Sequence, residues 1–166
     1  MNTFNDKSVY LFINGVVDRG FGNIIAGGVL QNQNGNGILG YNHYLGKCST
    51  FEAELWGVLD GILILRSKGF TKAMIHIDNL EVARALHDGM LVDADITMLK
   101  RVQRIMRTDG QWSIRYILGE NNLVADTLVK LSLEWESRLQ IYDKAPNEVL
   151  DVLNKEQASG AFVSLV

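Results

Sequence analysis

The stretch STFEAELWGVLDGILILRSKG, residues 49–69, marks the point at which the chain changes from strands to helices. Ser49 or Thr50 can cap a helix here, and Gly69 can end it. Within this helix Glu54 has Phe51 three residues before it and Val58 four residues after it, so it lies on an apolar face. A carboxylate buried there must be paired or metal-bound. A buried salt bridge, a wider polar face and a functional acid all remain open.

Before this helix the sequence is strand-like and punctuated by glycines. The pattern predicts three strands, at residues 8–14, 23–31 and 37–45, with the polar stretch QNQNGNG as the hairpin between the second and the third. The match of GNGILG, residues 35–40, to a dinucleotide-binding motif is therefore set aside, because a strand rather than a helix follows it.

The first strand, in VYLFINGV (residues 9–16), is apolar on both faces, which is typical of a strand in the middle of a covered sheet. It ends on Asn14 and Gly15. Asn-Gly is a common hairpin turn, but it can equally be the end of a central strand that displays a functional side chain.

After residue 69 strands and helices alternate. We expect strands at 72–78 and 111–118 and helices near 79–88, 94–110, 120–136 and 147–156. Three strands followed by helix-linked strands predict an α/β fold with a mixed sheet and helices on its faces. We expect one domain over residues 1–138 and a C-terminal extension over 139–166 that is partly helical or disordered.

The composition limits the class of protein. A chain of 166 residues with 47% hydrophobic residues can bury a core as one domain, and it contains no apolar run long enough to cross a bilayer. The single cysteine and the lack of a signal peptide at the N-terminus lead us to expect an intracellular protein, in the nucleus or the cytoplasm. A net charge of −3 argues against non-specific coating of nucleic acid, though not against an enzyme with a local basic patch.

Three further features have both a structural and a functional interpretation. Asp78 ends an apolar strand, where it can cap the next helix or stand at a ligand-binding edge. Asp126 can pair with Lys130 four residues later or take part in a site. The basic residues of KRVQRIMR, residues 100–107, could meet phosphates, but a solvated helix face is the simpler interpretation.

Taken together, three segments carry a resemblance to a known family: CSTFEAELWGVLDGI (48–62), IHIDN (75–79) and GENNLVAD (119–126). The chain resembles the ribonuclease H family, and within it the plant reverse-transcriptase-like branch related to retrotransposons. The resemblance covers roughly residues 8–134. It implies a five-stranded mixed sheet, with the first three strands antiparallel and helices on both faces.

The resemblance also implies an activity and a site. Members of this family bind two divalent ions, Mg²⁺ or Mn²⁺, through four carboxylates and cut the RNA strand of an RNA–DNA hybrid. Glu54, Asp78 and Asp126 match three of these acids, and Asn14 stands at the fourth position. Thr50 matches a position that in relatives touches a 2′-hydroxyl, and Gly15 would let the backbone approach the same strand.

Two residues depart from the family pattern. Asn14 replaces an aspartate that bridges both ions, so we expect weak metal binding and a large loss of rate, and Asp18 is badly placed to compensate. Tyr116 stands ten residues before Asp126, where related sequences often carry a histidine. The resemblance therefore leaves it uncertain that the chain is an active enzyme.

Three functions follow from these residues. The first is a ribonuclease H-type hydrolase, either impaired by a natural Asn14 or engineered by an Asp-to-Asn change. The second is a non-catalytic binder of hybrids or double-stranded RNA. The third is a protein-interaction adaptor that keeps only the fold. The retained acids Glu54, Asp78 and Asp126 favour the first two, and the acidic pI of 5.6 keeps the third in view.

Overall fold

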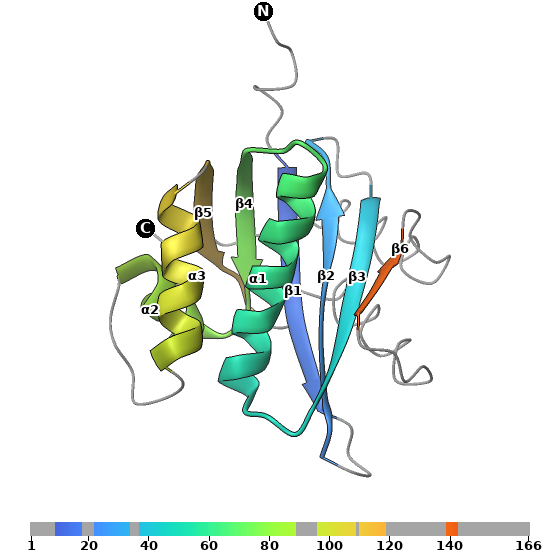
Figure 1. Cartoon of the computed structure of the whole chain (residues 1–166), viewed down its shortest axis with the longest axis vertical. Coiled ribbons are helices and arrows are strands. Elements are labelled where there is room, and N and C mark those ends of the chain that lie inside the picture. Colours follow the sequence, from blue (N-terminus) through green and yellow to red (C-terminus); the bar gives the residue numbers. More distant parts are fainter. Residues whose placement is uncertain are drawn as a thin grey trace, which may run out of the picture.

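The structure is a computed structural model that describes residues 9–17, 22–33, 37–88, 96–108, 110–118 and 139–142. These residues form one mixed sheet covered on one face by helices (Figure 1). The strands are β1 (Val9–Val17), β2 (Ile24–Gln31), β3 (Gly37–Gly46), β4 (Lys72–Ile77), β5 (Gln111–Tyr116) and β6 (Leu139–Tyr142). The helices are α1 (Thr50–Ser67), α2 (Leu80–Asp88) and α3 (Ile96–Thr108).

The strand order in the sheet is β5-β4-β1-β2-β3-β6. Strands β1, β2 and β3 form an antiparallel meander, whereas β4 lies parallel to β1 and β5 lies parallel to β4. The predicted α/β class with a mixed sheet and three antiparallel leading strands is therefore confirmed. The apolar pattern of β1 has its expected cause, because β1 is a central strand with neighbours on both sides.

The three described helices pack against one face of the sheet and against one another (Figure 1). The main core lies between them and this face, and includes Leu11 and Ile13 of β1, Leu55 and Leu59 of α1, and Ile75 of β4. The helix expected at 120–136 and the helical spacing at 147–156 lie outside the described residues.

Helix α1 lies close to the sheet because two of its buried positions are glycines. An added Cβ at Gly57 would lie 2.5 Å from Cγ2 of Ile13, and one at Gly61 would overlap Cδ2 of Leu11. Real Cβ atoms do not tolerate such distances, so any other residue would require Ile13, Leu11 or the helix itself to shift. The Tyr41 hydroxyl of β3 also donates a 2.6 Å hydrogen bond to the Gly57 carbonyl. These contacts fix how far the middle of α1 stands from β1.

The sheet contains one strand that the sequence pattern did not predict. β6 pairs antiparallel with β3, from His43 opposite Leu139 to Gly40 opposite Tyr142. These four residues open the segment that we expected to be an extension with helix or disorder, so the sheet continues past residue 138. Within the described ranges, no helix combines the length and the hydropathy that a membrane span requires.

Candidate functional site

The Asn14–Gly15 pair lies inside a strand and forms no hairpin turn. β1 runs on to Val17, with Asn14 opposite Gly27 and Gly15 opposite Ala26 of β2. On its other side β1 pairs with β4 as far as Ile13 and Ile77. Asn14 and Asp78 therefore follow directly after the last paired residues of two adjacent parallel strands. The carboxyl ends of parallel strands are where open α/β sheets place functional groups.

Glu54 reaches this place from the first half of α1. The helix begins at Thr50 because the Ser49 side chain accepts a hydrogen bond of 3.1 Å from the Glu52 amide and so caps it. Glu54 follows one turn later with a side chain that is only 4% exposed. The Gly15 amide donates a 3.1 Å hydrogen bond to its Oε1 atom. A residue of β1 thus holds the carboxylate at the end of the strand.

The protonation of Glu54 reflects a crowded and dry environment. Burial raises the pKa of Glu54 well above 4.5, the repulsion of Asp78 raises it further, and the Gly15 hydrogen bond lowers it in part. Its second oxygen, Oε2, is buried and has no hydrogen-bond donor among the described residues. Two neighbouring acids, one with an oxygen that lacks a donor, are a local arrangement that a cation would stabilise.

The remaining predicted site residues are placed unequally. Thr50 is exposed at the first position of α1, one turn before Glu54. The backbone of Asn14 lies beside Asp78 as described above, but its side chain, like all of Asp126, lies outside the described part of the chain. No group of three or more His, Cys, Asp or Glu residues suited to a metal ion occurs among the described residues. The site thus brings together Glu54, Asp78 and the backbone of Asn14 and Gly15.

The three histidines lie in different environments. His76 of β4 is buried and stacks on Phe12 with ring centroids 4.4 Å apart. Burial and the positive charge of Arg115 lower its pKa to about 4, so it is a neutral core residue at pH 7. His87 is exposed on α2. His76 is therefore part of the core, and His87 lies at the surface.

Two features of this region were not predicted from the sequence. The first is the Gly15 amide as the donor that orients Glu54. The second is a pair between His43 of β3 and Asp60 of α1, whose Nδ1 and Oδ2 atoms are 2.7 Å apart. Both join residues far apart in the chain, so no local pattern indicates them. Tyr116 ends β5 opposite Ile77 of β4, and therefore also lies at the carboxyl end of the sheet.

The chain matches a known protein family over most of its length. The model of the reverse transcriptase-like family matches residues 13–132, which is most of the chain and includes the three segments with the motifs. The chain belongs to the reverse transcriptase-like branch of the ribonuclease H family. A protein of Arabidopsis thaliana named as a candidate ribonuclease H protein is 25% identical to this domain over 132 residues, 79% of the chain. The chain spans about one fifth (21%) of that relative's length.

Solved structures of ribonuclease H proteins share the fold of this reverse transcriptase-like domain. Ribonuclease H1 of the halophilic archaeon Halobacterium salinarum matches with a TM-score of 0.66 and 21% identity, over 76% of this chain and 98% of its own. A ribonuclease H1 isolated from compost by a metagenomic approach, solved in complex with an RNA/DNA hybrid, matches with a TM-score of 0.66 and 18% identity, over 78% of this chain and 97% of its own. At these identities the likeness concerns the ribonuclease H fold alone.

Proposed function

We propose that this reverse transcriptase-like domain binds RNA–DNA hybrids and hydrolyses their RNA strand at a rate that Asn14 keeps low. The observation that carries the proposal is the proximity of Glu54 to Asp78 at the carboxyl ends of β1 and β4. Oε2 of Glu54 is buried there and has no hydrogen-bond donor among the described residues. A chain that used its fold only as a scaffold would have no need for two repelling acids in this position. The hybrid bound to the metagenomic ribonuclease H1 supports the choice of substrate.

The residues of the site fit divalent ions by their chemistry. Glu54 and Asp78 supply carboxylate oxygens, and the donor-poor oxygen of Glu54 is the atom that a cation would satisfy. We assign Glu54, Asp78, Asp126 and the side-chain carbonyl of Asn14 as the groups that would hold two Mg²⁺ or Mn²⁺ ions. Binding of these ions would be weak because an amide stands at one of the four carboxylate positions. Two bound ions would supply an activated water and stabilisation of the leaving oxygen.

The chain's own residues have distinct tasks in this proposal. The Gly15 amide orients the Glu54 carboxylate through its 3.1 Å hydrogen bond, so the ligand is in place before substrate arrives. The exposed Thr50 hydroxyl, one helical turn before Glu54, contacts a 2′-hydroxyl of the RNA strand and so distinguishes RNA from DNA. Gly15, at the same edge of the sheet, leaves room for the sugar–phosphate backbone.

Asn14 explains why the rate should be low. An amide keeps the shape and one oxygen of aspartate but loses a negative charge, so three acids face two dications. In a partly screened site two unit charges ~4 Å apart interact by about 4 kcal/mol. Desolvation of a carboxylate offsets part of this, yet ~1.4 kcal/mol already corresponds to a tenfold change in rate. The same substitution favours a second candidate function, a binder of hybrids or double-stranded RNA that does not cut.

A cleavage assay separates these two functions. The chain and its Asn14→Asp variant would be compared on an RNA–DNA hybrid with Mg²⁺ and with Mn²⁺. We expect Asn14→Asp to raise metal-dependent cleavage by orders of magnitude, and Glu54→Gln added to that variant to abolish the gain. An Asn14→Asp variant that binds hybrid and metal but still fails to cut would establish the non-catalytic binder. A chain that binds neither hybrid nor duplex RNA at low salt would leave the adaptor function.

A further inference from the structure

Helix α3 presents a strongly basic face that the catalytic proposal does not use. Its thirteen residues include four basic residues and no acidic one, in a chain with a net charge of −3. Met98, Leu99 and Val102 pack into the core, whereas the basic residues are exposed. The basic residues are Lys100, Arg101, Arg104 and Arg107. Positive charge is therefore concentrated on the outer side of one helix.

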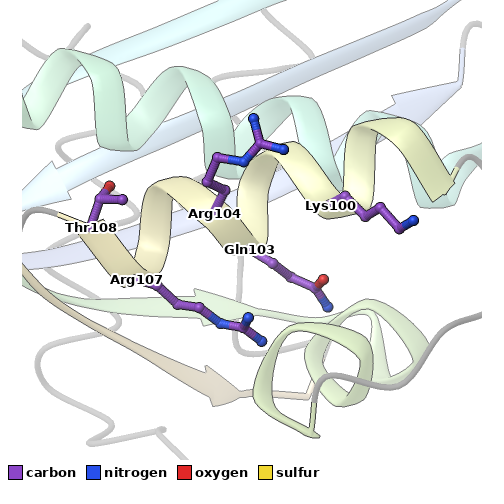
Figure 2. A pocket seen from close by; sticks show the side chains of 5 residues that line it. All are labelled: Lys100, Gln103, Arg104, Arg107 and Thr108. Atoms are coloured by element: carbon purple, nitrogen blue, oxygen red, sulfur yellow. The ribbon is translucent and has the colours of Figure 1, made fainter.

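This face contains an open hollow of about 380 Å³. It is lined by Lys100, Gln103, Arg104, Arg107 and Thr108 (Figure 2). Figure 2 shows the side chains of Arg104 and Arg107 diverging from the same exposed face of α3, Arg104 toward α1 and Arg107 away from it. The Gln103 side-chain amide donates a 3.1 Å hydrogen bond to the Ala85 carbonyl of α2, which ties the floor of the hollow to the neighbouring helix.

The basic side chains follow the helix axis in a row. Lys100, Arg104 and Arg107 are separated by four and then three residues, so at 1.5 Å per residue they stand about 6 Å and then about 4.5 Å apart along α3. Each successive turn thus adds one cation to the same exposed face of the helix. Such a row suits a ligand that carries regularly repeated negative charges.

We propose that this row, the α3 basic face, binds the phosphate backbone of the nucleic acid held at the site of Glu54 and Asp78. The inference rests on the proposed function for the identity of the nucleic acid. Every side chain that lines the hollow is Lys, Arg, Gln or Thr, which are types that contact phosphate oxygens. An acidic protein partner is disfavoured because the hollow has no apolar or aromatic anchor of the kind that protein interfaces use.

The direction of α3 separates this contact from the cleavage site. Thr108 precedes Gln111, where β5 starts, and β5 runs parallel to β4. The end of α3 near Arg107 therefore lies toward the amino ends of these strands, away from the carboxyl ends where Asp78 stands. Lys100 is nearer the other end of the helix. The α3 basic face therefore contributes affinity for phosphates distant from the scissile bond and leaves the chemical step unchanged.

A salt-dependent binding measurement tests the inference. Anisotropy of a labelled RNA–DNA hybrid, recorded with EDTA from low to moderate salt, would compare the parent chain with Arg104→Gln/Arg107→Gln. The control is Lys68→Gln/Lys72→Gln, which removes two exposed positive charges from outside α3. We expect the Arg pair to weaken hybrid binding about tenfold and to reduce the slope of log K against log salt by about two. The control should change both far less.

Cleavage kinetics and the binding of polyglutamate provide two further tests of the inference. In an Asn14→Asp background the Arg pair should raise KM and leave kcat unchanged. Equal hybrid affinity and equal salt slope in the Arg pair and the control would overturn the inference while the proposed function stands. Loss of labelled polyglutamate binding without any loss of hybrid binding would overturn it in favour of an acidic protein. A parent chain that binds no hybrid would overturn the proposed function and this inference together.

Discussion

Glu54 shows how a single buried acid links stability to function in this domain. Its carboxylate is enclosed by the helix and the sheet, beside Asp78, and only Oε1 receives a described hydrogen bond. A group whose pKa is raised on folding contributes full stability below its ordinary pKa, and that stability is lost as the pH rises through the folded-state pKa. In the absence of metal, Glu54 therefore opposes folding at neutral pH.

The first prediction concerns Glu54→Gln. Glutamine keeps the oxygen that accepts from Gly15 but has no charge, so the metal-free variant should be more stable than the parent at pH 7. The difference should close near pH 4.5, and each unit of pKa shift that is removed accounts for about 1.4 kcal/mol. Urea unfolding in EDTA from pH 4.5 to 7.5 measures this. Added Mn²⁺ should stabilise the parent more than the variant, and identical pH profiles in EDTA would contradict the prediction.

The second prediction concerns His76, whose pKa falls from 6.5 to about 4 on folding through burial and the charge of Arg115. The pH dependence of stability is opposite to that of Glu54, because His76 binds a proton in the unfolded chain at a pH at which it stays neutral in the folded chain. Stability should fall by about 3 kcal/mol as the pH drops from 6.5 to 4. His76→Phe retains a ring against Phe12 and cannot titrate, so this part of the pH dependence should vanish. Unfolding curves of both chains at each pH provide the test, and parallel curves would refute it.

Sequence reasoning reached some of these residues and missed others for a physical reason. Glu54 could be singled out because helical periodicity reports neighbours three and four residues away, and Phe51 and Val58 are apolar. The Gly15 amide and the His43–Asp60 pair could not, because each partner is brought by a different element across the sheet. The site roles of Asn14, Asp126 and Thr50 came from family resemblance, and these roles stay predictions.

Among the elements, α1 depends most on small residues. Gly57 faces Ile13, whose branched side chain is restricted in its rotamers, and its carbonyl accepts the Tyr41 hydroxyl hydrogen bond. The helix cannot move outward without losing this hydrogen bond and the placement of Glu54 one turn earlier. Gly57 thus fixes both the packing of α1 and the position of the acid that α1 carries.

The third prediction is that Gly57→Ala destabilises the domain in spite of the higher helix propensity of alanine. The added methyl group must displace Ile13 or the helix, and overpacking of this kind costs about 1–3 kcal/mol. Thermal or urea unfolding measures the loss, and hybrid binding should weaken as Glu54 shifts. Arg84→Ala, at an exposed position of α2, is the control and should change stability little. A fully stable Gly57→Ala domain would mean that α1 has more freedom than its contacts imply.

The elements that were predicted well are those with strong periodicity. α1 was expected at 49–69 and runs from Thr50 to Ser67, and β4 was expected at 72–78 and runs from Lys72 to Ile77. β6 was missed because four residues are too few to establish a period of two, and LQIY gains its strand conformation only by pairing with β3. Tertiary pairing, not local preference, decides that segment.

At the scale of the whole molecule, the order of elements along the chain was enough to predict a mixed sheet. The first three strands follow one another closely in the sequence and pair antiparallel, and strands joined through helices pair parallel. The strand order, with β1 between β2 and β4, puts the ends of β1 and β4 side by side. The site is therefore a consequence of topology, since Asn14 and Asp78 meet only because β4 returns to the centre of the sheet.

The pairing of β6 with β3 also affects how the domain avoids self-association. Between Gly40 and His43 every second residue of β3 directs its backbone amide and carbonyl toward β6, and without β6 these groups would form an open template for another strand. The family match ends at residue 132, so a fragment trimmed to that boundary would lack this cover. Such a fragment should keep the central strands yet associate through β3 and precipitate more readily than the full chain. β6 thus protects the edge of β3 from aggregation.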